Sequence, residues 1–418
     1  MSRSIPLHIS NVPPLSLHVP EPRQRPGADP DFSHMHFDAA GAVRRPPHDV
    51  DAGEIRDLPY ALIGVLDKEG QAVGEWNPDL APEHLIQALR HMMLTRAYDE
   101  RMVRMQRQGK TSFYMKCTGE EAVAVGAAMA LDDSDMCFPT YRQQGLLVAR
   151  DWPLREMMNQ VYSNSGDRLK GRQMPVFYSS RQAGFFSISG NLGTQYSQAV
   201  GWAMGSAAKG DTKIAAAWIG DGATAEGDFH YALTFASVYR VPVVLNIVNN
   251  QWAISSFSGI AGGDATTFAA RGLAYGLPAL RVDGNDLLAV YAATAWAAAR
   301  ARANMGATVI ELVTYRSDAH STSDDPGRYR PATEGACWPL GDPIARLKHH
   351  LLLTGHWDDR KDQEMQDEVT DHVKMEGKAS EALGTLGRGP QLDPATMFDD
   401  VFRDMPPHLQ RQRTQMGF

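Results

Sequence analysis

Two polar clusters follow two apolar segments of the chain. Asp221 lies between two glycines after the apolar run 214–219, and Asn249–Asn250 follow the run 243–248. Neither run alternates with polar residues, which is typical of strands buried on both faces of a parallel sheet. A strand–helix–strand unit brings both strand ends to one sheet edge, so we expect Asp221 and Asn250 to converge. A carboxylate and an amide oxygen near a helix N-terminus suit a magnesium ion that also holds a diphosphate.

The surrounding segments predict the elements that position this pair. A helix is expected from Thr224, with Phe229, Leu233, Ala236 and Tyr239 on its buried face. Other patterns predict helices at 82–108, 120–131 and 201–209, strands ending at 138 and spanning 308–313, and helices after 341. His320 lies in a polar loop after the last of these strands, where catalytic groups are expected in open α/β sheets.

Length and composition predict one large α/β domain with two attachments. The chain has 418 residues, 43% of them apolar, enough for a substantial core. Residues 1–60 hold ten of the 25 prolines and little periodicity, so they are interpreted as an extended arm ordered by a partner, or else as a disordered tail. The α/β domain is expected over 61–345, with a mostly parallel sheet covered by helices on both faces. A helical tail over 346–418 follows, in which 397–409 is a candidate docking element.

Charge, hydropathy and cysteine content restrict the partners. The formal net charge of −8, with mixed signs, argues against nucleic acid. Prolines interrupt every candidate secretory segment, and no apolar run is long enough to span a membrane. Three cysteines without metal-type spacing fit a reducing cytoplasm. We therefore expect a cytoplasmic protein.

Several segments carry a resemblance to a known family. The Gly-Asp-Gly and Asn-Asn pair looks like the thiamine diphosphate fingerprint, and the chain from about 62 to 338 resembles the alpha subunits of heterotetrameric 2-oxoacid dehydrogenases, specifically the branched-chain type. The matching segments are 112–135, 141–145, 170–178, 187–201 and 314–330. Pyruvate-type subunits carry a GGSMH-like segment where this chain has GRQMP, which favours the branched-chain type.

The resemblance implies a thiamine diphosphate-binding fold and assigns its residues. Magnesium would be held by the side chains of Asp221 and Asn250 and by the backbone carbonyl of Trp252. Relatives have an Arg before the Asn pair, where this chain has Val248, so Arg142 or Arg316 would supply that charge. The residues expected to contact the cofactor are Tyr141, Arg142, Gly190, Leu192, Gly220, Asp221, Gly222, Ala223, Asn250, Trp252, Ile254 and His320.

Three further roles follow from the resemblance alone. His320 would orient substrate or transfer a proton, and the neighbouring Ser321 aligns with a serine that mitochondrial relatives phosphorylate. Phe113 and Tyr114 would form an apolar acyl pocket. Ser189, Thr194 and Gln195 match a potassium site.

The implied activity is oxidative decarboxylation of branched-chain 2-oxo acids, with reductive acylation of a lipoyl group on a dihydrolipoyl transacylase core. The glutamate that activates the cofactor belongs to a second α/β domain that this chain lacks, so a beta subunit in an α2β2 assembly would complete the site. Two alternatives stay open: a pyruvate or acetoin dehydrogenase alpha subunit, and a noncatalytic cofactor-binding module. A nicotinamide dehydrogenase is disfavoured because no GxGxxG follows a strand.

Overall fold

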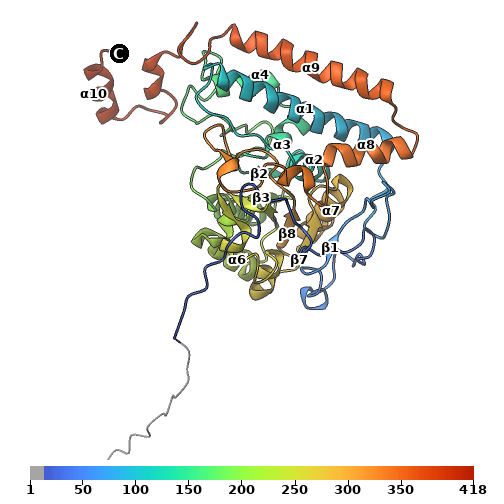
Figure 1. The fold of residues 1–418 in the computed structure, drawn as a ribbon. Coiled ribbons are helices and arrows are strands. Elements are labelled where there is room, and N and C mark those ends of the chain that lie inside the picture. Colours follow the sequence, from blue (N-terminus) through green and yellow to red (C-terminus); the bar gives the residue numbers. More distant parts are fainter. Residues whose placement is uncertain (1–13) are drawn as a thin grey trace, which may run out of the picture.

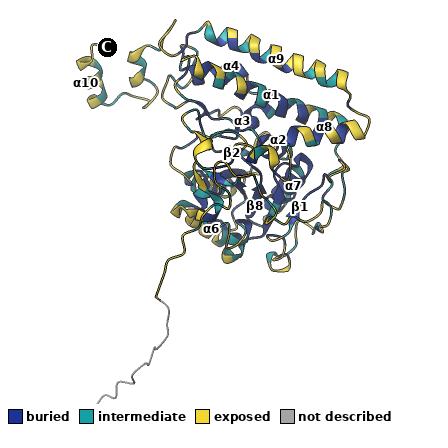
Figure 2. Cartoon of the chain, in the orientation of Figure 1, coloured by how far each residue is buried: buried dark blue, intermediate teal, exposed yellow. Residues whose placement is uncertain are grey.

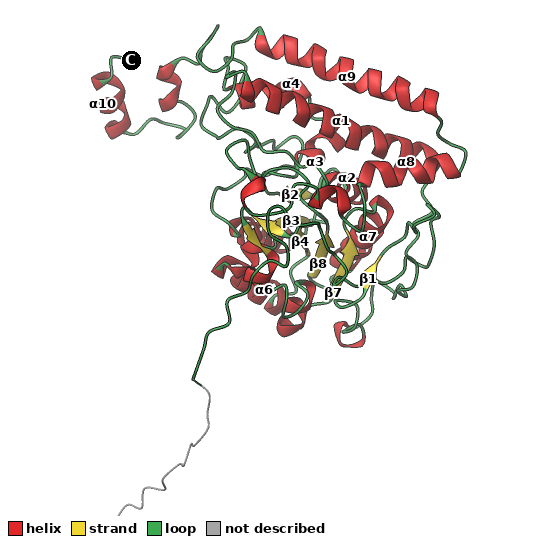
Figure 3. Ribbon diagram, viewed as in Figure 1, coloured by secondary structure: helices red, strands yellow, loops and turns green. Residues whose placement is uncertain are grey.

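The core of the protein is a six-stranded sheet in which every pairing is parallel. The structure is a computed structural model that describes residues 14–418. The strand order of this sheet is β1-β7-β8-β4-β3-β2 (Figures 1 and 3). Strands β5 and β6 form a separate two-stranded antiparallel hairpin. The strands are β1 (Leu62–Ile63), β2 (Met136–Phe138), β3 (Ala215–Gly220), β4 (Val243–Asn249), β5 (Trp252–Ala253), β6 (Ser256–Phe257), β7 (Ala279–Asp283) and β8 (Thr308–Val313).

Ten α-helices are present in the described part of the chain. They are α1 (Pro82–Arg107), α2 (Glu121–Ala130), α3 (Gln144–Ala149), α4 (Leu154–Tyr162), α5 (Thr194–Ala208), α6 (Gly227–Val238), α7 (Leu287–Arg302), α8 (Pro343–Leu353), α9 (Asp359–Glu381) and α10 (Pro407–Gln415). Among residues 14–418 no helix is both long and apolar enough to cross a membrane.

Helices cover both faces of the sheet, as the sequence predicts. Alternate residues of the central strands point to opposite sides. Trp218 and Val244 face the core built with α2 and α7, whereas Ile219 and Leu245 face the core built with α5 and α6. Because both faces are covered, β4 is buried along its whole length. This explains why the strand sequences are continuously apolar.

The helix beginning in the Gly-Asp-Gly segment starts later than the sequence predicts. Residues Gly222–Ala225 form a 3₁₀ turn, and α6 begins only at Gly227. Phe229 and Leu233 are buried as expected, but Tyr239, just after the last residue of α6, is exposed. Much of α6 is exposed (Figure 2), and its exposed large apolar residues form an apolar stripe with Tyr239: Tyr231, Phe235, Val238 and Tyr239.

The C-terminal helices fold back on the helical layer beside the sheet. Helices α8 and α9 pack on α1, and α9 also packs on α4 (Figure 1). Ion pairs such as Arg101–Glu381 lie along this contact, while the outer face of α9 is solvated, as its charge run predicts. Helix α8 starts at Pro343 behind an Asp342 cap, two residues before the expected domain boundary. The docking role expected for 397–409 stays a prediction.

Much of the N-terminal arm lies on its own chain. The ring of Phe32 packs edge-to-face on Tyr315 and Trp338, with centroids 6.2 and 5.3 Å away. Farther along, Trp296 of α7 donates to the Pro46 carbonyl at 2.9 Å. Residues 32–58 thus have partners within the α/β domain, while the expected role of another subunit in ordering the arm stays a prediction. Residues 1–13 of the predicted arm lie outside the described residues.

We predict that Phe32→Ala releases the arm. Each aromatic pair contributes about 0.5–1.5 kcal/mol, so losing two should raise the population of the open arm by roughly fivefold or more. The measurement is the rate of proteolytic cleavage between residues 32 and 50, read by mass spectrometry. Leu17→Ala is the control because Leu17 is fully exposed. Equal cleavage rates in both variants would contradict this anchoring.

Candidate active site

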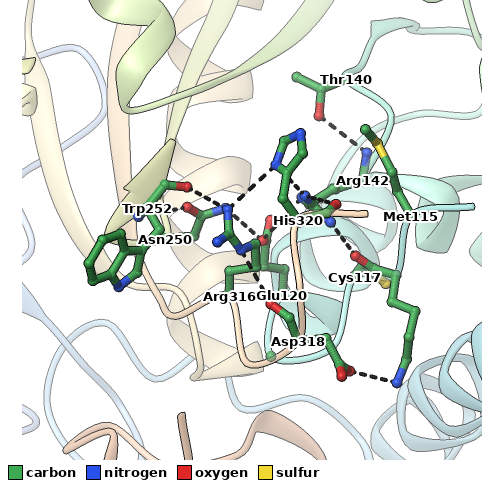
Figure 4. Close-up of polar contacts among 12 residues, drawn as sticks. Met115, Cys117, Glu120, Thr140, Arg142, Asn250, Trp252, Arg316, Asp318 and His320 are labelled. Carbon is green, nitrogen blue, oxygen red and sulfur yellow. Dashed lines mark hydrogen bonds and ion pairs between the residues drawn. The ribbon is translucent and has the colours of Figure 1, made fainter. Parts of the chain in front are cut away.

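A cavity of about 510 Å³ opens at the carboxyl ends of the central strands. Its wall combines the N-terminus of α2, the segments after β2 and β3, the loop before α5, the β5–β6 hairpin and the loop after β8. Every one of these segments either follows a parallel strand or lies beside that edge. The sheet therefore gathers polar side chains that are far apart in the sequence (Figure 4).

Most residues singled out by the sequence lie on this cavity. All the residues expected to contact the cofactor line the cavity, and so do Ser189 and Gln195 of the expected potassium site. The expected cofactor contacts are Tyr141, Arg142, Gly190, Leu192, Gly220, Asp221, Gly222, Ala223, Asn250, Trp252, Ile254 and His320. Their joint placement is a fact of geometry. The chemical role of each residue stays a prediction.

Asp221 has a carboxylate oxygen without a partner. Its Oδ1 accepts the Gly222 N–H at 2.8 Å, whereas Oδ2 is buried with no hydrogen bond inside the chain. Burial raises the pKa of Asp221 to about 7 because a charge is costly away from water. A Cβ atom at Gly222 would lie 2.5 Å from the Ala253 Cβ, so glycine is required for the hairpin to approach this closely. The unpartnered oxygen fits a cation ligand.

Asn250 begins a sharply bent segment that leads into the hairpin. Gln251 and Ile254 both have left-handed backbone conformations, with φ of 72° and 55°. The Asn250 Oδ1 accepts the Trp252 N–H at 3.3 Å, and its Nδ2 donates to Glu120 at 2.7 Å. The neighbouring Asn249 Nδ2 donates to the buried Glu311 at 2.8 Å. Each amide of the Asn pair is therefore tied to a different buried glutamate.

The carbonyl of Trp252 accepts a hydrogen bond from the guanidinium group of Arg316. Arg316 donates to it at 3.0 Å and also donates to the Ile254 carbonyl and the Tyr329 hydroxyl, at 2.9 and 2.7 Å (Figure 4). Arg316 thereby holds the β5–β6 hairpin in place through two of its backbone carbonyls, but it does not line the cavity. Since a carbonyl oxygen has two lone pairs, this contact leaves one for a metal ion.

The donor set of Asp221, Asn250 and the Trp252 carbonyl fits a hard cation. All three supply oxygen, the ligand that magnesium prefers. Among residues 14–418 no group of three His, Cys, Asp or Glu side chains could hold a metal ion. A site built from one carboxylate, one amide and one carbonyl needs further oxygens, which the phosphates of a bound cofactor would provide.

Arg142 holds His320 in the wall of the cavity. One guanidinium nitrogen donates to the His320 Nδ1 at 2.9 Å and to its carbonyl at 2.6 Å, and another donates to the Lys116 carbonyl. Arg142 is the only Lys or Arg among the described lining residues. Relatives carry an arginine where this chain has Val248, and of the two arginines expected to supply that positive charge, Arg142 is the one that lines the cavity. Its guanidinium group donates to Lys116 and His320 of the same chain.

These contacts fix the protonation state of His320. An arginine can only donate, so Nδ1 must accept, and the ring proton resides on Nε2. Burial lowers the pKa of His320 to about 3, and the positive charges of Arg142 and Arg316 act in the same direction. His320 is therefore neutral at physiological pH and offers an N–H for hydrogen bonding.

Among the charged residues that line the cavity, Glu120 was not indicated by the sequence. Glu120 precedes α2, is only 1% exposed and reaches the cavity beside Asn250 and Arg142. Burial raises the pKa of its carboxyl, while Arg142 and the amide of Asn250 act in the opposite direction. In the sequence it is one of two successive glutamates before an Ala-rich helix, a pattern that resembles simple helix capping. No sequence signal separates it from Glu121, which pairs with Arg96 at 2.7 Å.

The residues expected to bind potassium lie around the start of α5. The Gln195 Nε2 donates to the Trp218 carbonyl at 2.9 Å, while its Oε1 is buried without a partner. Thr194 does not line the cavity, and its hydroxyl lies 3.4 Å from the Asp228 carboxylate. The unpartnered amide oxygen of Gln195 could serve as a cation ligand, and the potassium site stays a prediction.

The two residues expected to form the acyl pocket do not line this cavity, and their role stays a prediction. Neither Phe113 nor Tyr114 lines the cavity, and Met115 does so instead. Tyr114 is fully buried, and its hydroxyl donates to Asp99 at 2.6 Å. The loop after α1 folds back on this helix and places the Tyr114 hydroxyl on Asp99, which no local sequence pattern indicates. None of the residues of the GRQMP segment lines the cavity, although Phe177, two residues later, does. Arg172 of this segment contacts the backbone of 396–399 in the tail.

Comparisons with known proteins agree on one family. Residues 89–387 match the family model described as "Dehydrogenase E1 component", and residues 13–53 match "2-oxoisovalerate dehydrogenase E1 alpha subunit N terminal". The chain is 58% identical to the 2-oxoisovalerate dehydrogenase subunit alpha of Pseudomonas aeruginosa, over 98% of this chain and all of the relative. It is 40% identical to the mitochondrial subunit of Bos taurus, over 85% of this chain and 77% of the relative. It is 38% identical to the 3-methyl-2-oxobutanoate dehydrogenase subunit alpha of Mycobacterium tuberculosis, over 86% and 93%.

We predict that His320 stays neutral far into the acid range. Nitrogen-15 NMR of histidine-labelled protein should show His320 as a neutral Nε2–H imidazole at pH 5, where N-acetylhistidine, with a pKa near 6.5, is largely protonated. Arg142→Met should raise the pKa of His320 and shift its titration profile to higher pH. Because the pKa of His320 is about 3 in the folded protein and about 6.5 in the unfolded chain, the unfolded chain binds a proton at a higher pH. The free energy of unfolding therefore decreases as the pH falls from about 6.5 to 3. A His320 profile matching the reference compound would contradict the assigned contacts.

Proposed function

The chain belongs to the dehydrogenase E1 component family, and from that premise we propose that it is the alpha subunit of a branched-chain 2-oxoacid dehydrogenase. The reaction is thiamine diphosphate-dependent oxidative decarboxylation of branched-chain 2-oxo acids, followed by reductive acylation of a lipoyl group on a dihydrolipoyl transacylase. The supporting observation is one cavity that holds both an unpartnered Asp221 oxygen and the neutral His320.

Each group in the cavity has a defined task. When bound, thiamine diphosphate supplies the electron sink that no side chain offers for the carbanion left by decarboxylation. Asp221, Asn250 and the Trp252 carbonyl would hold magnesium against the diphosphate. Gly190, Leu192 and Ile254 would contact the cofactor rings, and Ser189, Thr194 and Gln195 would bind potassium.

His320 acts in this proposal as a hydrogen-bond donor. Its Nε2 proton is available because Arg142 occupies Nδ1. With a pKa of about 3 the ring carries no charge at neutral pH, so it can orient the oxygens of an anionic substrate. Orientation is therefore favoured over the proton transfer that an imidazolium would perform.

A beta subunit would close the cavity. Leu192, Ile254 and Ile260 line its mouth and are each more than half exposed, at 52%, 53% and 55%. Apolar side chains around the opening of a polar site are typical of a surface that a partner covers. With a single six-stranded sheet in the described chain, a second subunit would supply the other half of the site in an α2β2 assembly. The apolar stripe of α6 offers further surface for such an assembly.

We also propose a cytoplasmic location. All three cysteines are free, and Cys337 is exposed. An exposed free thiol fits a reducing compartment.

The activity is tested by co-expression with the candidate beta subunit. We expect carbon dioxide release from 3-methyl-2-oxobutanoate that requires thiamine diphosphate and magnesium and exceeds release from pyruvate. His320→Ala should lower kcat by roughly 100-fold or more, the range expected for a positioned catalytic group. His356→Ala, at an exposed residue outside the cavity, is the matched control.

The outcomes separate the alternatives. Preference for pyruvate would place the chain with the pyruvate or acetoin type. Cofactor binding without turnover of any 2-oxo acid would favour a noncatalytic module. Full activity in His320→Ala would remove this residue from the proposed reaction.

The metal site has its own prediction. Asp221→Ala removes the only carboxylate in the proposed ligand set, so we expect cation affinity to fall by at least 10- to 100-fold. The measurement is a titration of the cofactor-loaded α2β2 assembly with manganese, in which electron paramagnetic resonance detects the free ion. Asp211→Ala, at an exposed aspartate, is the control. Unchanged manganese binding in Asp221→Ala would contradict the assignment.

A further inference from the structure

Glu120 is fixed beside the proposed metal site by the turn that precedes it. Gly119 has a left-handed φ of 95°, and a Cβ atom there would lie 2.2 Å from the Tyr315 carbonyl oxygen. The Gly119 carbonyl accepts from Asn285 at 3.0 Å and from Thr314 at 2.8 Å. This turn is therefore pressed onto the end of β8, and the Glu120 side chain projects into the cavity wall.

The Glu120 carboxylate has no close cationic partner. Its nearest ion-pair contact is Arg142 Nε, 3.9 Å away, which is beyond a hydrogen bond. Its hydrogen-bond donor is the Asn250 amide at 2.7 Å. Burying a carboxylate without a tight ion pair is costly, and the neighbouring Glu121 shows the alternative, a close pair with Arg96. The contact with Asn250 is thus the distinctive interaction of Glu120.

The two neighbours of the Asn250 amide determine its orientation. A carboxylate accepts, so the side facing Glu120 must be the NH₂ group, and the Trp252 N–H donates, so the side facing it must be Oδ1 (Figure 4). A flipped amide would set oxygen against carboxylate and NH₂ against N–H. Without Glu120, only the longer 3.3 Å contact to Trp252 would oppose that flip.

We propose that Glu120 is a positioning residue for the divalent cation: by accepting the Asn250 N–H it keeps the amide oxygen, rather than the NH₂ group, available as a metal ligand. This inference rests on the proposed function, because it requires Asn250 to bind the cation. Glu120 itself needs no contact with metal or substrate. Partners that orient metal ligands typically change metal affinity by 10- to 100-fold when removed.

Two substitutions separate hydrogen bonding from charge. Glu120→Gln keeps an oxygen that can accept from Asn250 but removes the charge, whereas Glu120→Ala removes the acceptor. The affinity for manganese is measured by electron paramagnetic resonance on the α2β2 assembly loaded with thiamine diphosphate. In Glu120→Gln we expect this affinity to stay within about threefold of wild type. In Glu120→Ala it should fall by about 10- to 100-fold.

A double-mutant cycle and a matched control complete the test. In an Asn250→Ala background, Glu120→Ala should cause no further loss, because the amide that it orients is absent. Asp135→Asn alters a buried carboxylate that pairs with Arg302 at the opposite, amino end of the sheet, so it should lower thermal stability without changing manganese affinity. Melting temperatures of all variants without cofactor identify any loss that is due to unfolding.

Each result supports or overturns the inference. Equal manganese affinity in wild type and Glu120→Ala would overturn it, and so would equal losses in Glu120→Gln and Glu120→Ala, which would assign the effect to charge. Additive losses in the Asn250→Ala background would also overturn it, because Glu120 would then act independently of the amide. If Asn250→Ala alone binds manganese normally, the metal site of the proposed function fails, which is a distinguishable outcome.

Discussion

Charged and polar side chains are buried together at the carboxyl edge of the sheet, and each must find a partner there. Arg142, Arg316, Glu120 and Asn250 are all less than a tenth exposed. Their hydrogen bonds join segments that are far apart in the sequence, so moving one segment would leave a buried group unsatisfied. The same requirement makes two buried oxygens of the cavity informative, Asp221 Oδ2 and Gln195 Oε1, because neither has a hydrogen-bond partner in the described chain.

Arg316 connects this network to the arm. It binds the two hairpin carbonyls and the Tyr329 hydroxyl, and Tyr329 packs against Trp252 with a centroid distance of 5.2 Å. The same aromatic cluster includes Trp338, on which Phe32 of the arm lies. The β5–β6 hairpin, which would supply a magnesium ligand, is thus held by the Arg316 guanidinium group and by the aromatic cluster around Trp252. A rigid support of this kind reduces the reorganisation that cofactor binding would otherwise require.

The sequence predicted the sheet edge well because two strong local signals coincide there. Continuous apolar strands and the polar residues that end them are visible in a single segment, and parallel connections allow only one relative placement. The direction of the Tyr114 side chain could not be predicted in this way. Its hydroxyl donates to Asp99 of α1, a contact that forms only when the loop after α1 folds back on the helix. The contacts of the arm with its own chain could not be predicted because its composition lacks periodicity, and in the structure Phe32 lies on Trp338 and Tyr315.

The sequence by itself determined the parallel α/β architecture, the family resemblance and the positions of Asp221, Asn250 and His320, because these depend on local periodicity and on motifs within short segments. Only the tertiary structure decided that Arg142 holds His320 in its neutral form and that Glu120 rather than Glu121 faces Asn250. Hydrogen-bond partners across 130 or more residues depend on how helices dock against the sheet. Side-chain direction at such contacts is set by packing, which leaves no periodic trace in the chain.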